Sequence, residues 1–378
     1  MLMLLSLPLF VQACAAGGPG DADIETQLKR MTLREKIGQL FIVRPEAFDP
    51  DIVWTTGEDL VPYAIRSVNA RMAATNRKYP VGGILLYGHN IDTPEQVEKF
   101  IGELRRFKGN PLICIDEEGG RVARIGNNPN FNVPRFQSMA AVGSTGDSQA
   151  AYKAAFAIGS YLTEYGFDID FAPVADVNTN PQNVIIGARA FSDSPSVAAP
   201  MVVQYVKGLK DAGIVGCLKH FPGHGDTYAD THLGYAVSHK TWEEMLDCEM
   251  QTFKAGIAAG VPMVMTSHIS APKVTGSEIP STLSPVILQE KLRGELGFQG
   301  VIITDGMEMG AITRQFSSEE AAILAIQAGA DILLGSRDYP KVFEAVLKAV
   351  KDGTIPESRI DESVRRILAL RALVQSGK

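Results

Sequence analysis

Short apolar and β-branched runs alternate with longer amphipathic stretches along most of the chain. Near-continuous apolar runs are typical of strands in a parallel sheet that helices cover on both faces. Within 94–107 the apolar residues recur at i, i+3, i+4 and i+7, which is the spacing of one helix face. The predicted strands are 37–43, 82–88, 112–118, 168–174, 216–222, 263–269, 301–307 and 331–336. The predicted helices are 94–107, 149–165, 197–212, 242–260, 285–296, 319–328 and 341–351.

Alternating strands and helices of this number predict an α/β fold, a single (β/α)8 barrel of the TIM type. Several of the helices end in Gly just before a strand, and Gly closes a helix at little steric cost. An open, doubly wound sheet is the alternative. We expect one barrel domain over 24–378 and no second α/β domain. The connections 44–79 and 119–148 would be insertions, and 361–374 a closing helix on the barrel wall.

The first residues are interpreted as a leader and a tether, over 1–23, outside the fold. Residues 1–11 are almost wholly apolar but too few to span a bilayer, as in the apolar region of a secretory signal. Val11-Gln12-Ala13-Cys14 is similar to a bacterial lipobox, in which Cys14 would carry the lipid. We expect a location in the bacterial cell envelope or outside the cell. An anchor at Cys14 would be the membrane contact, and plain secretion and a cytoplasmic location are the alternatives.

Composition and charge exclude several classes of protein. A hydrophobic content of 45% is too high for a disordered chain, and 4 Cys in 378 residues are too few for a disulfide scaffold. Cys114, Cys217 and Cys248 are expected to be buried and unpaired. The net charge of -7 offers no basic excess to attract nucleic acid, so no nucleic-acid partner is expected. We expect a monomer.

Charged and imidazole side chains gather where four of the predicted strands end. Active sites of (β/α)8 barrels lie at the C-terminal ends of the strands. Buried charge is costly unless it is paired or used, so this concentration predicts one catalytic site there. The four segments are 116–121, 219–227, 266–268 and 304–307.

Asp305 is the sharpest candidate among them. It directly follows the apolar run 301–304, so a strand would hold it rigidly at the barrel mouth. A carboxylate in this position could attack an anomeric carbon or stabilise an oxocarbenium ion. The alternative is an Asp that caps the following helix.

Lys219 and His220 leave the fifth strand side by side. Adjacent strand residues point to opposite faces, unless the strand end relaxes that rule. Pro222 and Gly223 follow at once, so both side chains could reach the site and donate to sugar hydroxyls or to an amide oxygen. The alternative is that one of them faces outward. His224 stands four residues after His220, but Pro and Gly between them prevent a helix, so we expect no metal and a loop-fixing role for His224.

Asp230-Thr231-His232 is a second candidate unit. In an extended loop, residues i and i+2 point the same way, and a carboxylate beside an imidazole sets its tautomer and raises its basicity. The pair could transfer protons near neutral pH. Arg124 and Arg189 also belong near the mouth, where a guanidinium could bind a carbonyl or hydroxyls. A surface ion pair is the alternative for each.

These motifs together resemble glycoside hydrolase family 3, and within it the β-N-acetylhexosaminidase branch. The resemblance rests on DEEGGRV at 116–122, KHFPGHGDT at 219–227, DTH at 230–232 and TD at 304–305, and it covers most of the chain after Thr32. Glu117 stands where the family usually has Gln, a change that should not abolish binding. We expect no second α/β domain, which supplies the acid in many β-glucosidases of the family, because the Asp–His pair would make one unnecessary.

The resemblance implies a retaining mechanism with a covalent glycosyl-enzyme intermediate and without a metal or organic cofactor. Asp305 would be the nucleophile, and His232 the general acid/base, held by Asp230. The other implied contacts are to N-acetylglucosamine: Lys219, His220 and Arg189 at the ring and acetamido group, Asp116 and Arg124 at the outer hydroxyls.

We therefore expect an exo-acting β-N-acetylglucosaminidase that removes terminal GlcNAc from cell-wall muropeptides or other glycans. Three alternatives stay open: a phosphorylase or transglycosylase on the same fold, because a His acid tolerates an anionic acceptor; a β-glucosidase; and a surface lipoprotein that binds glycans without turnover.

Overall fold

Eight parallel strands close into a barrel in the order β1-β10-β9-β8-β7-β6-β3-β2. The computed structural model describes residues 21–49, 64–227, 236–336 and 338–377. A two-stranded antiparallel hairpin, β4–β5, stands apart from the barrel. The (β/α)8 prediction is confirmed. The strands are β1 Phe41–Val43, β2 Gly83–Leu86, β3 Leu112–Ile115, β4 Glu117–Gly119, β5 Val122–Ala123, β6 Ile169–Asp170, β7 Val215–Phe221, β8 Met263–Thr266, β9 Val301–Gly306 and β10 Ile332–Leu334.

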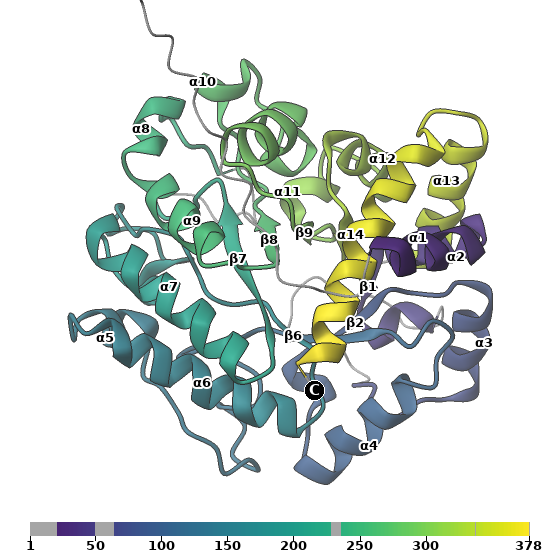
Figure 1. Cartoon of the computed structure of the whole chain (residues 1–378), viewed down its shortest axis with the longest axis horizontal. Helices are drawn as coiled ribbons and strands as arrows, with labels where there is room; N and C mark the ends of the chain where they lie inside the picture. Colours follow the sequence, from purple (N-terminus) through teal and green to yellow (C-terminus); the bar gives the residue numbers. More distant parts are fainter. Residues whose placement is uncertain (1–20, 50–63, 228–235, 337, 378) are drawn as a thin grey trace, which may run out of the picture.

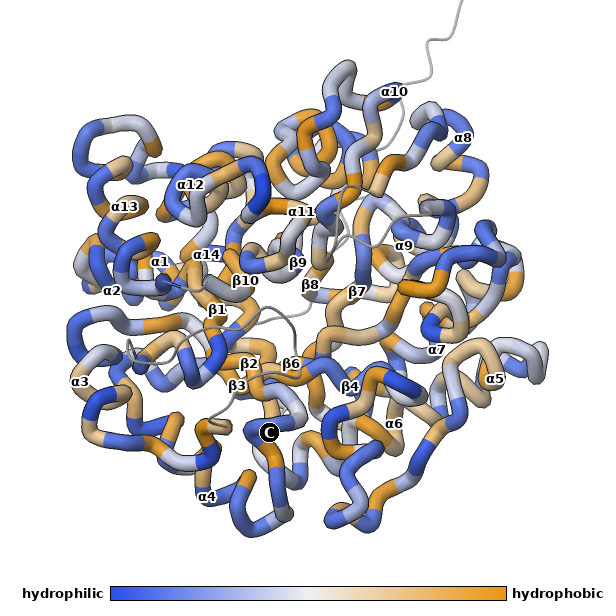
Figure 2. The backbone as a smooth tube through the Cα atoms, turned by 180° about the vertical axis from the view of Figure 1, so that it is seen from behind, coloured by the Kyte–Doolittle hydropathy of each residue, from blue (hydrophilic) through white to orange (hydrophobic). Residues whose placement is uncertain are grey.

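Helices surround the strands on all sides (Figure 1). Seen from behind, the tube is mostly hydrophobic in colour along β1, β2 and β3 near its centre, and the residues of these strands are buried (Figure 2). The helices are α1 Asp21–Arg30, α2 Leu33–Gln39, α3 Ala70–Lys78, α4 Pro94–Leu104, α5 Met139–Gly143, α6 Ser148–Glu164, α7 Pro195–Asp211, α8 Trp242–Leu246, α9 Glu249–Ala258, α10 Pro272–Thr275, α11 Gly310–Thr313, α12 Ser318–Ala328, α13 Tyr339–Lys351 and α14 Glu357–Ser376. Short 3-10 segments cover Pro45–Phe48, Gly88–Asn90, Gly187–Arg189 and Ser281–Leu283, and Val286–Glu295 is a π-helix.

The first predicted strand, 37–43, is wrong in its first half. Ile37 belongs to α2, and the strand starts only at Phe41. The Thr32 hydroxyl accepts the backbone N–H of Glu35, and the Glu35 carboxylate accepts the backbone N–H of Thr32, which forms a capping box at the start of α2. The apolar run therefore crosses from the buried face of a helix directly into a strand.

The closing helix α14 lies across the N-terminal ends of the strands, and not on the outer barrel wall as expected. Arg366 Nη1 lies 3.0 Å from Asp331 Oδ1, just before β10. Arg371 donates to the carbonyl oxygens of Gly82 (2.7 Å) and Asn110 (3.0 Å), just before β2 and β3. Figure 1 shows this helix crossing the middle of the molecule beside α1. The helix therefore closes the end of the barrel opposite to the strand C-termini.

The N-terminal predictions mostly fall on residues 1–20, which lie outside the described residues, and Cys14 is among them. Helix α1 begins at Asp21, so the last residues of the expected tether are helical. None of the helices in the described part of the chain is long and apolar enough to cross a membrane. Cys114 and Cys217 are buried free thiols as expected, whereas Cys248 is only partly buried.

Candidate active site

One ammonium group joins two carboxylates where β3 and β7 end. Lys219 Nζ lies 2.7 Å from Asp116 Oδ1 and 2.6 Å from Glu118 Oε1. The Lys219 side chain is 2% exposed and that of Glu118 is 1% exposed, whereas the side chain of Asp116 is 17% exposed. Asp116 is thus the member of this trio that faces the open mouth.

Arg189 completes the pairing of Glu118 with a forked contact. Its Nε and Nη2 donate to the two oxygens of Glu118 at 2.8 and 2.7 Å. Burial alone would raise the pKa of the Glu118 carboxyl, but the Arg189 and Lys219 cations hold that pKa below its usual range. Burial would likewise lower the pKa of Lys219, and the Asp116 and Glu118 carboxylates raise it above its usual range. All three groups are therefore charged at neutral pH.

His220 is fixed in one tautomer by its two neighbours. Its Nδ1 lies 2.7 Å from Asp176 Oδ2, and its Nε2 lies 3.2 Å from Arg189 Nη2. A guanidinium only donates, so Nε2 accepts and the proton sits on Nδ1, facing the carboxylate. Burial would raise the pKa of Asp176, and the adjacent His220 lowers it below its usual range. The ring is therefore oriented as well as held.

Both Lys219 and His220 reach the mouth, although they are neighbours on β7. The pairing of β7 with β8 shifts register between Leu218 and Phe221, which relaxes the strict alternation of faces. The peptide bond between Lys219 and His220 is cis. Lys219 contacts Asp116 and Glu118 and His220 contacts Arg189, so neither side chain faces outward.

Arg124 lies beside Asp116 on the hairpin that follows β3. Its Nη2 is 3.9 Å from Asp116 Oδ2, and its guanidinium lies 5.5 Å from the centroid of the Tyr87 ring. The five predicted contact residues, Asp116, Arg124, Arg189, Lys219 and His220, thus form one continuous cluster.

The Glu117 side chain binds the backbone at the end of the same hairpin. Its carboxylate accepts backbone N–H groups from Arg124 (2.5 Å), Ile125 (2.9 Å) and Gly126 (2.7 Å), and the hydroxyl of Tyr161 at 2.7 Å. Burial raises the pKa of Glu117 above its usual range, although these four donors oppose the shift. The residue that departs from the family pattern therefore holds the backbone of a predicted sugar-binding residue.

Asp305 lies at the end of β9, partly buried, as the sequence predicts. Its Oδ1 accepts the N–H of Gly306 at 2.7 Å. Helix α11 begins only at Gly310, with Met309 as its N-cap, so Asp305 does not cap it. Burial lowers the pKa of His224, and the carboxylates of Asp176 and Asp305 oppose this shift. Because β7, β8 and β9 run parallel in one barrel, the ends of β7 and β9 lie at the same mouth.

His224 holds its loop by hydrogen bonds, as expected. Its backbone N–H donates to Asp176 at 2.6 Å, and its Nδ1 lies 2.7 Å from Thr227 Oγ1. In the described part of the chain, no group of three or more His, Cys, Asp or Glu residues could hold a metal ion. Asp230 and His232 lie within 228–235, outside the described residues, so their placement stays a prediction.

Glu118 and Asp176 are the site residues that sequence reasoning missed. Glu118 is the last residue of the predicted strand 112–118 and Asp176 lies two residues after 168–174, so both stand at strand ends, the signal that identified Asp116 and Asp305. Their importance depends on partners from other strands, Arg189 and His220, and spacing along the chain does not show such pairing.

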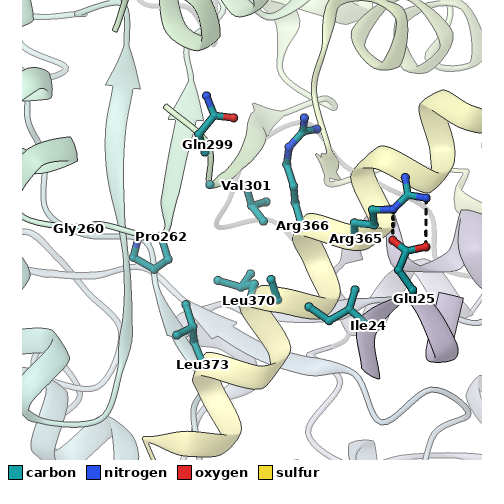
Figure 3. A pocket seen from close by; sticks show the side chains of 12 residues that line it. Ile24, Glu25, Gly260, Pro262, Gln299, Val301, Arg365, Arg366, Leu370 and Leu373 are labelled. Carbon is teal, nitrogen blue, oxygen red and sulfur yellow. Dashed lines mark hydrogen bonds and ion pairs between the residues drawn. The ribbon is translucent and has the colours of Figure 1, made fainter. Parts of the chain in front are cut away.

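A groove of about 590 Å³ lies at the opposite end of the barrel and is a separate feature (Figure 3). Leu370 and Leu373 of α14 line it together with Pro262 and Val301 at the strand starts. Glu25 and Arg365 form an ion pair at its edge. Its lining is mainly apolar and holds none of the predicted site residues.

Comparison with known proteins gives a family match over most of the chain. The family described as "Glycosyl hydrolase family 3 N terminal domain" matches residues 32–370. The matched segment contains the whole barrel and every residue of the cluster at its mouth.

Two curated relatives and one solved structure are informative. "Beta-hexosaminidase A" of Pseudoalteromonas piscicida is 33% identical over 78% of this chain and 54% of its own length. "Beta-hexosaminidase" of Stenotrophomonas maltophilia is 35% identical over 72% of this chain and 80% of its own. The solved family 3 β-N-acetylglucosaminidase from Paenibacillus sp. str. FPU-7 is 36% identical with a TM-score of 0.82, over 91% of this chain and 63% of that one. The chain thus spans little more than half of the first relative and less than two thirds of this solved chain.

Proposed function

The chain belongs to glycosyl hydrolase family 3, and from this premise we propose that it is a retaining exo-β-N-acetylglucosaminidase that hydrolyses terminal β-linked GlcNAc. The relatives named β-hexosaminidase and the solved β-N-acetylglucosaminidase support the choice of sugar. The single observation that carries the proposal is the set of five buried or partly buried charged and imidazole groups at the mouth of the barrel, the end at which β9 also places Asp305.

The cluster is suited to grip one sugar ring. Asp116 keeps one oxygen on Lys219 and turns a partly exposed side chain to the mouth, where it can accept hydrogen bonds from outer hydroxyls. Arg124 lies beside it and can donate to the same hydroxyls. Lys219, His220 and Arg189 would contact the ring and the acetamido group. Because these groups are already paired and oriented, little reorganisation is needed when the sugar enters.

The chemistry would proceed in two displacements. An Asp305 oxygen forms a bond to the anomeric carbon as the aglycone oxygen leaves and takes a proton from His232. A water then attacks the same carbon, gives its proton to His232 and releases Asp305, so the anomeric configuration is retained. Asp230 would orient the imidazole of His232 for both transfers.

The natural substrate would be cell-wall muropeptide fragments or other GlcNAc-terminated glycans. This suits the proposed location in the cell envelope or outside the cell, with Cys14 as the site of a lipid anchor. Radiolabelled fatty acid fed to a bacterial host tests the anchor, because label should be incorporated by the full chain and lost from the C14S variant.

A mechanism-based inactivator tests the proposed reaction directly. A 5-fluoro derivative of a GlcNAc donor should label the protein covalently, and peptide mapping should place the label on Asp305. The protein should prefer aryl β-GlcNAc to aryl β-glucoside and should release free GlcNAc with or without phosphate. A preference for the glucoside would overturn the acetamido assignment, and GlcNAc-1-phosphate as the main product would identify a phosphorylase.

A further inference from the structure

We propose that His268 is a positioning residue for the Asp305 carboxylate, an inference that rests on the proposed role of Asp305 as nucleophile. His268 follows β8 by two residues and is fully buried. The sequence places it at a strand end, but neither the proposed sugar contacts nor the proton transfer uses it.

Two hydrogen bonds connect His268 with the carboxylate. His268 Nε2 lies 2.9 Å from the carbonyl oxygen of Gly306, the residue directly after Asp305. The backbone N–H of Gly306 in turn donates to Asp305 Oδ1 at 2.7 Å. The imidazole therefore holds the residue whose amide orients the nucleophilic oxygen.

The proton on Nε2 is required by the chemistry of its partner. A carbonyl oxygen only accepts, so Nε2 must carry a proton for this bond to exist. On the other side of the ring, Nδ1 lies 2.9 Å from Thr282 Oγ1. The Thr282 hydroxyl also lies 2.7 Å from Thr266 Oγ1 and 3.0 Å from the carbonyl oxygen of Ser267.

This arrangement is satisfied whether His268 is neutral or charged. In the neutral ring, Thr282 donates to Nδ1 and accepts from Thr266. In the charged ring, Nδ1 donates to Thr282, whose hydroxyl donates to the carbonyl oxygen of Ser267 and still accepts from Thr266. In both states Nε2 keeps its proton and donates it to the Gly306 carbonyl oxygen, so the hydrogen bond to Gly306 does not depend on the protonation of His268.

The backbone of Gly306 needs hydrogen bonds to fix its conformation. It has no side chain to pack, and its backbone is the least restricted of any residue type. Its carbonyl oxygen also accepts the N–H of Met309 at 3.0 Å, so two donors on different elements fix it. A displacement of about 1 Å at a reacting group costs about 100-fold in rate, which makes a small shift here measurable.

Variants of His268 separate positioning from core filling. H268N and H268M remove the donor to Gly306, whereas H268Q retains an N–H at about the reach of Nε2. The matched control is T282V, which disrupts the same buried network without touching Gly306. For each full-length variant we would measure the rate of covalent labelling by the 5-fluoro inactivator, the inhibition constant for free GlcNAc and the urea unfolding midpoint.

We expect H268N and H268M to be labelled about 10- to 100-fold more slowly than the native protein, with an unchanged inhibition constant for GlcNAc. H268Q should recover most of the rate. T282V should lose stability comparably to H268N yet keep a near-native labelling rate. Two donor-lacking variants are included so that if one fails to fold the other decides.

Three results would overturn the inference: H268Q as slow as H268N, T282V as slow as H268N, or rate and GlcNAc binding falling together. Failure of the proposed function looks different, because the native protein itself would then not be labelled at Asp305.

Discussion

Lys219 Nζ and Glu118 Oε1 lie 2.6 Å apart, with each side chain at most 2% exposed. Glu118 also carries the forked contact from Arg189, so one carboxylate balances two cations. Removing its charge in E118Q leaves both cations buried with less compensation. Breaking a buried pair in this way costs about 3–5 kcal/mol of unfolding free energy, and urea titration should show a loss of this size.

The neighbouring carboxylate offers a matched control. D116N leaves Lys219 in contact with Glu118, and Asp116 is the more exposed of the two. Its stability loss should be clearly smaller, and its KM for aryl β-GlcNAc should rise because the variant loses an acceptor for outer hydroxyls. Equal stability losses in the two variants would mean that burial does not decide the cost.

Replacing Asp305 by Asn should remove the nucleophile and keep the sugar site. The D305N side chain is nearly isosteric, and Asn Oδ1 can still accept the Gly306 N–H. Turnover should fall by about three orders of magnitude or more, because a reaction through a covalent intermediate loses nearly all its rate when the nucleophile is removed. Calorimetric titration with GlcNAc should give near-native affinity. Near-native turnover would show that another group attacks the anomeric carbon.

The loss of rate on replacing His232 should grow with the pKa of the leaving group. The H232A variant cannot protonate the departing oxygen, and such acid catalysis contributes about 10²–10⁴-fold. An aryl glycoside with an acidic phenol leaves unaided, so its cleavage step should suffer much less than that of an alkyl glycoside. Rates plotted against leaving-group pKa should therefore be steeper for H232A than for the native protein. If the plots for H232A and the native protein are parallel, His232 is not the general acid.

The order of strands and the residues at their ends follow from the sequence, because burial and strand alternation leave a local pattern. The position of Asp305 after 301–304 is an example. Pairing across the barrel leaves no such pattern: Glu118 meets Lys219 although β6 lies between β3 and β7. The register shift after Leu218, which turns two adjacent residues to one mouth, depends on the neighbouring strand. The helical assignment of Ile37 was available in principle from the Thr32 and Glu35 capping box.

Glu117 should be more than a neutral replacement for the usual Gln. Its carboxylate meets four donors, and E117Q would turn an amide N–H₂ toward at least one of them. An unsatisfied buried polar group costs about 1–3 kcal/mol, so E117Q should be less stable by that amount and bind GlcNAc moderately more weakly. The control Y161F removes one donor without adding another and should cost less. An E117Q variant as stable as the native protein would mean that the hairpin rearranges freely.

Asp170, at the end of β6, should make stability fall as pH rises. Burial raises its pKa well above the ordinary value, although the Glu117 N–H that donates to its Oδ1 at 2.9 Å opposes the shift. Its Oδ2 is buried without a hydrogen-bond partner among the described residues. The folded protein therefore holds this proton more tightly than the unfolded chain does. Stability is highest below the ordinary pKa and is lost as pH rises toward the folded pKa.

The D170N variant tests this because its side chain is neutral throughout, and its Oδ1 can still accept the Glu117 N–H. We would measure the free energy of unfolding at about pH 5 and about pH 8. The value for D170N, relative to that of the native protein, should be higher at pH 8 than at pH 5. D168N is the matched control, since Asp168 pairs with Arg105 at 2.9 Å and accepts the Ile113 N–H. D168N should lower the free energy of unfolding at both pH values. If native protein and D170N change in parallel with pH, Asp170 is not the group that titrates, and the buried Glu117 beside it becomes the candidate.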